Sequence, residues 1–209
     1  LTETPSLGYR TGDSPSASIR INERAPYVPL DKLPWFPYDS IDVERYVVSN
    51  FLGTRVLSHN TSFGCPFACN FCAVVALANR RWLPESAERV AGIVQHMHQR
   101  WGINGIEFND MDFFVSEGRT AEFAERLANY AGDSIHWWGL GRVDTLMGYS
   151  DATWDKIKRS GAQMIFMGAE SGDDETLKMM NKGGTAATEL TLALVERMKH
   201  YDIVPELSF

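Results

Sequence analysis

The chain has 209 residues, of which 44% are hydrophobic and 22% are charged, so it is long and apolar enough to bury a core. Its net charge of −7 argues against a protein that holds nucleic acid through bulk positive charge, and no apolar run reaches membrane-spanning length. We therefore expect a soluble protein with no nucleic-acid partner and no membrane span.

The first 50 residues differ in composition from the rest. Residues 1 to about 18 are rich in Ser, Thr, Gly and Pro, so they are expected to form a loose linker. From Ile19 to Tyr46 the chain carries aromatic residues without helical or strand periodicity, and four prolines keep it extended. We divide the chain into a linker and extended connector at residues 1–50 and a core domain at residues 51–209.

Apolar strands and amphipathic helices alternate after Asn50. Strands are predicted at residues 55–60, 103–108, 135–140, 162–167 and 203–209, and helices are predicted to begin near Ser86, Thr120, Ser150 and Thr185. This alternation implies an α/β fold with right-handed crossovers and a parallel sheet. The nearly continuous apolar strands indicate that both faces of the sheet are covered. A doubly wound open sheet and a partial barrel both fit the pattern.

All three cysteines, Cys65, Cys69 and Cys72, lie in one short loop with the spacing C-x3-C-x2-C. Their thiolates can each bind a different iron of a 4Fe–4S cluster, which leaves the fourth iron open for a small molecule. A disulfide framework does not fit an odd number of cysteines. A zinc site needs a fourth ligand, and the nearest histidine, His59, precedes the loop. A ferredoxin normally supplies a fourth cysteine. Cysteines confined to one metal-type motif fit a reducing, cytoplasmic compartment.

With the aromatic Phe71 before its last cysteine, this loop resembles the signature loop of the radical S-adenosylmethionine (radical SAM) enzymes. The resemblance implies that Cys65, Cys69 and Cys72 hold a 4Fe–4S cluster and that the open iron chelates S-adenosyl-L-methionine (SAM). It implies reductive cleavage of SAM to methionine and a 5′-deoxyadenosyl radical, with flavodoxin or ferredoxin as electron donor, and it places Phe71 among the cofactor-binding residues. It selects a partial (βα)6 TIM-like barrel of parallel strands, truncated after about the fifth strand, with its chemistry at the C-terminal strand ends.

Polar residues follow the second predicted strand. Phe108, Asp110 and Phe113 resemble the F-x-D-D-x-F stretch of the cobalamin-linked subfamilies, although Met111 replaces its second Asp. The resemblance implies that Asp110 binds the SAM ammonium group, with Asn109 and Asp112 as substitutes. The alternative is that these acids cap or solvate a loop.

Two further stretches follow the third and fourth predicted strands. After the third, Arg142 is expected either to clamp a carboxylate in bidentate fashion or to form a structural ion pair with Asp144. After the fourth, Gly168 to Gly172 resembles the G-x-E-S-G stretch of the family, which implies that Glu170 and Ser171 contact the ribose or methionine part of SAM. Lys182 is as well explained by a charge at the end of a helical turn.

The barrel interpretation makes a geometric prediction. Residues that follow the C-terminal ends of parallel strands meet at one edge, so one hollow should gather Cys65, Cys69, Cys72, Asp110, Arg142 and Glu170. Asp110 and Glu170 should point into it and lack protein ion-pair partners other than Arg142.

The N-terminal connector bears on the reaction. The run from Leu33 to Asp39, followed by Tyr46, resembles the connector between a cobalamin-binding domain and the radical SAM domain of one subfamily. It implies cobalamin-dependent methyl transfer to an unactivated carbon of a small-molecule substrate, with cobalamin held by a domain absent from this chain. The alternatives are an oxidative cyclase, a methylthiotransferase, and a zinc- or cluster-stabilised structural domain that is not an enzyme. The first residue, Leu1, and the predicted strand at the end indicate a fragment.

Overall fold

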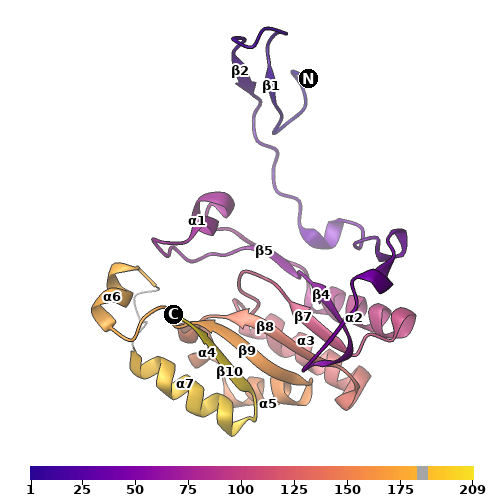
Figure 1. Cartoon of the computed structure of the whole chain (residues 1–209), viewed down its shortest axis with the longest axis vertical. Helices are drawn as coiled ribbons and strands as arrows, with labels where there is room; N and C mark the ends of the chain where they lie inside the picture. The colour runs from indigo at the N-terminus through magenta and orange to yellow at the C-terminus, as the bar shows by residue number, and fades with distance from the viewer. Residues whose placement is uncertain (183–187) are drawn as a thin grey trace.

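The structure is a computed structural model that describes residues 1–182 and 188–209. Its centre is a curled six-stranded sheet with the order β10-β9-β8-β7-β4-β3 (Figure 1). The strands are β3 (Val48–Asn50), β4 (Gly53–His59), β7 (Gly105–Phe108), β8 (His136–Gly141), β9 (Ala162–Gly168) and β10 (Val204–Ser208). Neighbours from β4 to β10 are parallel, and β3 pairs antiparallel with β4. The partial barrel of parallel strands is therefore confirmed.

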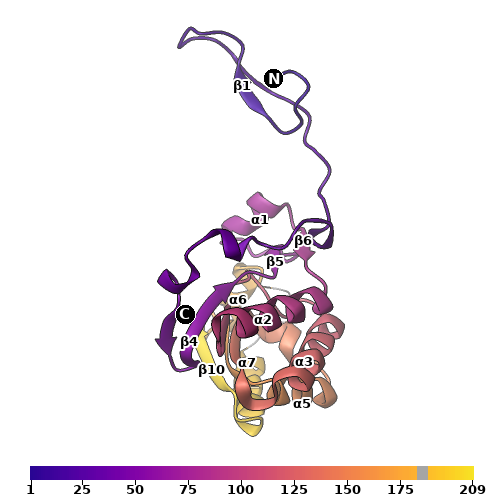
Figure 2. The same ribbon diagram turned by 90° about the vertical axis from the view of Figure 1, so that its right-hand side faces the viewer.

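The longer helices connect successive parallel strands and pack against the convex face of the sheet (Figure 2). The longer ones are α2 (Ala87–Trp101), α3 (Glu117–Ala131), α5 (Asp151–Arg159) and α7 (Thr188–His200), and the short ones are α1 (Ala73–Ala78), α4 (Val143–Met147) and α6 (Asp174–Met179). The short helices α1 and α6 lie beyond the strand ends (Figures 1 and 2). The start predicted near Thr185 for the last helix lies outside the described residues.

The expectation that both faces of the sheet are covered holds only in part, because Val56 and Met164 are buried on the concave face but other residues there are exposed. Leu57, Ile106 and Ile165 point into the helix-covered core, whereas Ser58 and Glu206 point to the concave face and are exposed. A half-barrel does not close on itself, so part of its inner face stays open to solvent or ligand.

Most helix starts follow the capping residues expected from the sequence. Ser86 and Ser150 accept hydrogen bonds from the backbone N–H groups three residues on, as N-caps do. Thr120 is not a cap, which corrects the prediction: α3 begins one turn earlier, where Ser116 accepts from the Arg119 N–H. The Thr120 hydroxyl is buried inside α3 and lies 3.1 Å from the hydroxyl of Tyr149.

The N-terminal residues contain a hairpin where a loose linker was expected. Strands β1 (Gly8–Arg10) and β2 (Ile19–Ile21) pair antiparallel, and the side-chain amide of Asn22 donates to the carbonyls of Leu1 and Thr4. Backbone hydrogen bonds between β1 and β2 hold this hairpin together, and such pairing cannot be predicted from amino-acid composition. It projects away from the barrel (Figure 1).

Residues 30–45 contain three short 3₁₀ turns, at Leu30–Lys32, Tyr38–Ser40 and Val43–Arg45. The connector packs against β4 and α2 through Tyr38, whose hydroxyl lies 2.7 Å from Nδ1 of His59 and whose ring meets that of Trp101. The connector is therefore fastened to the first strand of the barrel.

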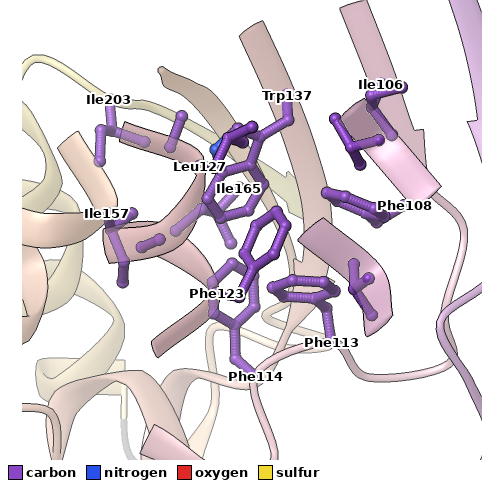
Figure 3. Packing of buried hydrophobic residues seen from close by; sticks show 14 of the residues in the cluster. Ile106, Phe108, Phe113, Phe114, Phe123, Leu127, Trp137, Ile157, Ile165 and Ile203 are labelled. Atoms are coloured by element: carbon purple, nitrogen blue, oxygen red, sulfur yellow. The ribbon is translucent and has the colours of Figure 1, made fainter. Parts of the chain in front are cut away.

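An aromatic cluster fills the space between the sheet and its helices (Figure 3). The rings of Phe108 and Phe113 stack at a centroid distance of 4.8 Å, and Phe123 and Trp137 meet both. All four are buried, and each contributes about 1.5–3 kcal/mol of apolar burial. Because Phe108 ends β7 and Phe113 follows residues 109–112, this cluster holds both ends of that polar turn.

Candidate cofactor site at the mouth of the half-barrel

The cysteine loop stands on a small hairpin rather than directly on β4. Strands β5 (Ser62–Gly64) and β6 (Trp82–Pro84) pair antiparallel, and the loop and α1 lie between them. Gly64 has a φ of +79°, and a Cβ there would collide with the backbone carbonyl of Arg81. The hairpin therefore requires glycine immediately before the first cysteine.

The loop is also tied to the chain after β9. The backbone N–H of Asn70 donates to the carbonyl of Met180 at 2.9 Å, and its side chain donates to the carbonyl of Met179 at 3.0 Å. The side chain of Asn181 donates in return to the carbonyl of Ala68 at 2.9 Å. These contacts join segments more than 100 residues apart and hold the loop over the C-terminal strand ends.

All three cysteines are free thiols. Cys69 is buried, Cys65 and Cys72 are half-buried, and burial raises the pKa of the Cys65 thiol. Among residues 1–182 and 188–209, no three His, Cys, Asp or Glu side chains are gathered closely enough to hold a single metal ion. An all-sulfur donor set on one pinned loop fits a cluster in which each thiolate binds its own iron.

Arg142, at the end of β8, lies against this loop. Its Nη1 is 3.2 Å from Sγ of Cys69, and its guanidinium carbon lies 3.9 Å from the centroid of the Phe67 ring. Its Nε and Nη2 donate to the two carboxylate oxygens of Asp144 at 3.0 and 2.7 Å. Of the two roles considered for Arg142, the structural ion pair with Asp144 is the one observed.

Asp110 is fully buried beneath the mouth. Its carboxylate accepts hydrogen bonds from the backbone N–H and hydroxyl of Thr61 at 3.1 and 2.8 Å, and from the hydroxyl of Ser62. Arg119 supports the same turn by donating to the Thr61 hydroxyl at 2.6 Å. Asp110 therefore fastens the β7 end to the turn after β4. Neighbouring Asn109 continues this tie, because its carbonyl accepts from the side chain of Asn60 at 3.0 Å.

In the turn at residues 109–112, Asp112 is the acid with a carboxylate oxygen that accepts no hydrogen bond from the described residues. It is 1% exposed; Oδ1 accepts from the Phe114 N–H at 3.0 Å, and Oδ2 has no hydrogen-bond partner among the described residues. Burial raises its pKa to about 7, although Arg142 acts in the opposite direction. Asp112 is close enough to Cys65 to raise the pKa of that thiol.

Glu170 follows β9 in a left-handed conformation, with a φ of +65°. Its carboxylate pairs with the ammonium group of Lys182, so the expectation that Glu170 lacks a protein partner is wrong. Lys182 is buried and lies 5.9 Å from the ring centroid of Phe71 in the cysteine loop. Ser171 points to a local turn, where its hydroxyl accepts from the Asp173 N–H.

The predicted residues therefore fall into two groups around the loop. Arg142 meets the loop at Phe67 and Cys69, and the Glu170–Lys182 pair meets it at Phe71. Sequence reasoning missed Lys182 as a partner of Glu170. The structure adds that a Cβ at Gly168 would meet both charged groups, which the sequence alone does not show.

A cavity of about 790 Å³ lies between the connector and the C-terminal part of β4. Its walls include Phe36, Tyr38, Leu57 and Phe63, and it does not touch the cysteines. The chemistry of the sulfur donors, rather than cavity size, therefore marks the candidate site.

The family model described as the Radical SAM superfamily matches residues 59–207, which include the cysteine loop and all the strand ends described above. The chain belongs to the radical SAM superfamily. This superfamily is a family of enzymes. The match extends from the end of β4 into β10.

The curated relatives of this chain are named as methyltransferases or as a cyclase. An uncharacterized methyltransferase of Pyrococcus horikoshii is 30% identical over 75% of this chain and 32% of the relative. The anaerobic magnesium-protoporphyrin IX monomethyl ester cyclase of Synechocystis is 24% identical over 73% of this chain and 30% of the relative. The chain thus spans about a third of the length of these relatives.

Solved structures share the fold at low sequence identity. The cobalamin-dependent radical SAM enzyme OxsB, with aqua-cobalamin and SAM bound, matches 99% of this chain and 29% of its own, with a TM-score of 0.75 and 19% identity. The radical SAM methyltransferase TsrM from Kitasatospora setae, with cobalamin and a [4Fe-4S] cluster bound, matches 72% of this chain and 30% of its own, with a TM-score of 0.63 and 15% identity. Within the part of the chain that the structure describes, no helix is long and apolar enough to cross a membrane.

Proposed function

We propose that residues 51–209 form the core of a cobalamin-dependent radical SAM methyltransferase in which Cys65, Cys69 and Cys72 bind a 4Fe–4S cluster. The observation that carries the proposal is the loop of three free thiols, pinned by Asn70 and Asn181 over the strand ends of a half-barrel. When bound, the cluster would supply the electron that cleaves SAM reductively. The protein's own task is to hold SAM beside the open iron and keep water away.

The unpaired oxygen of Asp112 supports assigning the SAM ammonium group to Asp112 rather than to Asp110. Asp110 already accepts three hydrogen bonds, and breaking them to bind a ligand would cost folding free energy. Asp112 Oδ2 has no such bond to lose. A cation there would also offset the cost of burying the carboxylate.

The Glu170–Lys182 pair supports a second contact to SAM. The two side chains are 21% and 9% exposed and offer acceptor and donor atoms side by side. Ribose hydroxyls and the methionine carboxylate are groups that such a pair can bind, with Phe71 nearby as an apolar surface. Asn109 and Ser171 stay weaker candidates, because the contacts described for Asn109 are those of its backbone with the end of β4 and the chain after it, and the Ser171 hydroxyl accepts from the Asp173 N–H in its own turn.

Cobalamin-dependent methyl transfer is the reaction we infer, on a small-molecule substrate with a flavodoxin- or ferredoxin-type electron donor. Residues 1–50 would then connect the barrel to a cobalamin-binding domain, and the fastening of Tyr38 to His59 on β4 suits such a connector. Oxidative cyclisation is the second candidate, since one curated relative is a cyclase.

The test uses the full-length protein, purified and reconstituted without oxygen. We expect about one bound cobalamin per chain and SAM consumption that requires both reductant and cobalamin. A Cys65→Ala variant should lose SAM consumption but keep cobalamin, because the two groups have separate sites. Turnover of SAM that is indifferent to cobalamin would reject methyl transfer by this route.

A further inference from the structure

We propose that Arg142 donates a hydrogen bond to the cluster thiolate of Cys69 and thereby raises the reduction potential of the cluster. The inference rests on the proposed function, because it assigns a role toward the cluster that the three cysteines would hold. The observation behind it is the distance of 3.2 Å between Nη1 of Arg142 and Sγ of Cys69.

The direction of this hydrogen bond is fixed by the rest of the guanidinium group. Nε and Nη2 are occupied by the two oxygens of Asp144, and the flat face of the group lies on the ring of Phe67. Arg142 and Asp144 have side chains that are only 8% and 13% exposed, so solvent screens the pair poorly. The remaining nitrogen, Nη1, is thus held against the sulfur.

Among the three thiols, the one that receives this bond is the most buried. Cys69 is 8% exposed, whereas Cys65 and Cys72 are half-buried. A buried thiolate has little access to water, so a protein donor is what stabilises its charge.

The effect on the cluster follows from charge. Reduction adds one electron to the iron–sulfur unit, and hydrogen bonds to the sulfurs and nearby positive charge stabilise the more negative state. Asp144 offsets part of the charge of Arg142, but the positive end of the pair is the end that meets the sulfur. Removing Arg142 should therefore make the cluster harder to reduce.

A purely structural role is the rival explanation, because Arg142 also ties the cysteine loop to the end of β8. The matched control is Arg197, whose guanidinium likewise lies over an aromatic ring, that of Trp154, and pairs with an aspartate, Asp151. Arg197 lies on α7 and pairs with α5, away from the loop. An Arg197→Met substitution removes the same groups without touching a cysteine.

The experiment is a redox titration of the reconstituted full-length protein without SAM, followed by electron paramagnetic resonance (EPR). We expect Arg142→Met to shift the midpoint to a more negative potential, Arg142→Lys to give a smaller shift, and Arg197→Met to match the wild type. In protein made with ¹⁵N-arginine, pulsed EPR should show a nitrogen coupling in the wild type and Arg197→Met that disappears in Arg142→Met.

Two outcomes would overturn the inference. One is an Arg142→Met protein that retains less cluster but titrates at the wild-type potential, because that is the signature of a structural role alone. The other is an unchanged nitrogen coupling. If wild-type protein fails to bind a 4Fe–4S cluster at all, the proposed function fails first, so the two failures are distinguishable.

Discussion

The hydroxyl of Thr61 donates to the carboxylate of Asp110 at 2.8 Å, and this bond joins the turn after β4 to the end of β7. Both residues are fully buried. The turn leads directly into the hairpin that carries the cysteine loop, so the position of the loop depends on this buried carboxylate.

Replacing Asp110 should therefore cost stability. Asp110→Ala leaves the Thr61 N–H and hydroxyl and the Ser62 hydroxyl without their acceptor, and we expect a loss of about 3 kcal/mol in the free energy of unfolding. Urea denaturation measures it. Asp39→Ala is the control, because Asp39 forms an exposed ion pair worth less than about 1 kcal/mol. Equal unfolding midpoints for the two variants would show that Asp110 does not hold the turn.

Asp112 should make stability depend on pH. Its folded pKa is about 7, against about 3.9 for an unfolded aspartate, so between these values the folded state keeps a proton that the unfolded state has lost. The free energy of unfolding should therefore fall as the pH rises from 4 to 7, by at most about 4 kcal/mol.

Asp112→Asn removes this ionisation and keeps an oxygen for the Phe114 N–H. We compare the free energies of unfolding of the variant and the wild type in iron-free protein. The difference between them should favour the variant more at pH 8 than at pH 5. Asp202→Asn, at a side chain that is 96% exposed, is the matched substitution and should show no such gain. The same difference between wild type and Asp112→Asn at both pH values would contradict the assignment.

A side chain at Gly168 should displace the Glu170–Lys182 pair. A methyl group there would meet the Glu170 carboxylate and the Lys182 ammonium group, which are the ends of two flexible side chains, so we expect Gly168→Ala to weaken SAM binding roughly tenfold with little loss of stability. Calorimetric titration of the reconstituted protein with SAM gives the affinity. Gly172→Ala, in the same sequence motif, is the control, because nothing lies within 4 Å of its Cβ position. If both variants bind SAM as the wild type does, the Glu170–Lys182 pair is not a SAM contact.

The parts of the fold that periodicity and motifs encode were predictable. The strand predicted at residues 162–167 is β9 (Ala162–Gly168), and the cysteine spacing marked the loop before any geometry was known. The choice between Asp110 and Asp112 was not predictable, because it depends on how the turn after β7 directs each side chain. Thr61 and Ser62, whose hydrogen bonds occupy the Asp110 carboxylate, are 49 and 48 residues away from it in sequence.

Long-range pairing explains the other differences. Lys182 pairs with Glu170, which lies 12 residues earlier on the other side of α6. The residues next to Lys182 in the sequence therefore predict only the end of a helix. The hairpin of β5 and β6 joins short segments on either side of the cysteine loop and α1, and neither segment has a strand pattern long enough to recognise. Such contacts are set by tertiary packing, which local propensity does not contain.

The central claim is that Cys65, Cys69 and Cys72 hold a 4Fe–4S cluster, and metal analysis of the full-length protein tests it most directly. After anaerobic purification and reconstitution, the account predicts about four iron and four sulfide ions at this loop. It also predicts a reduced-state EPR signal that changes when SAM is added. A Cys69→Ala variant should lose both. Stoichiometric zinc in place of iron, or a signal unaffected by SAM and by the cysteine substitution, would contradict the account.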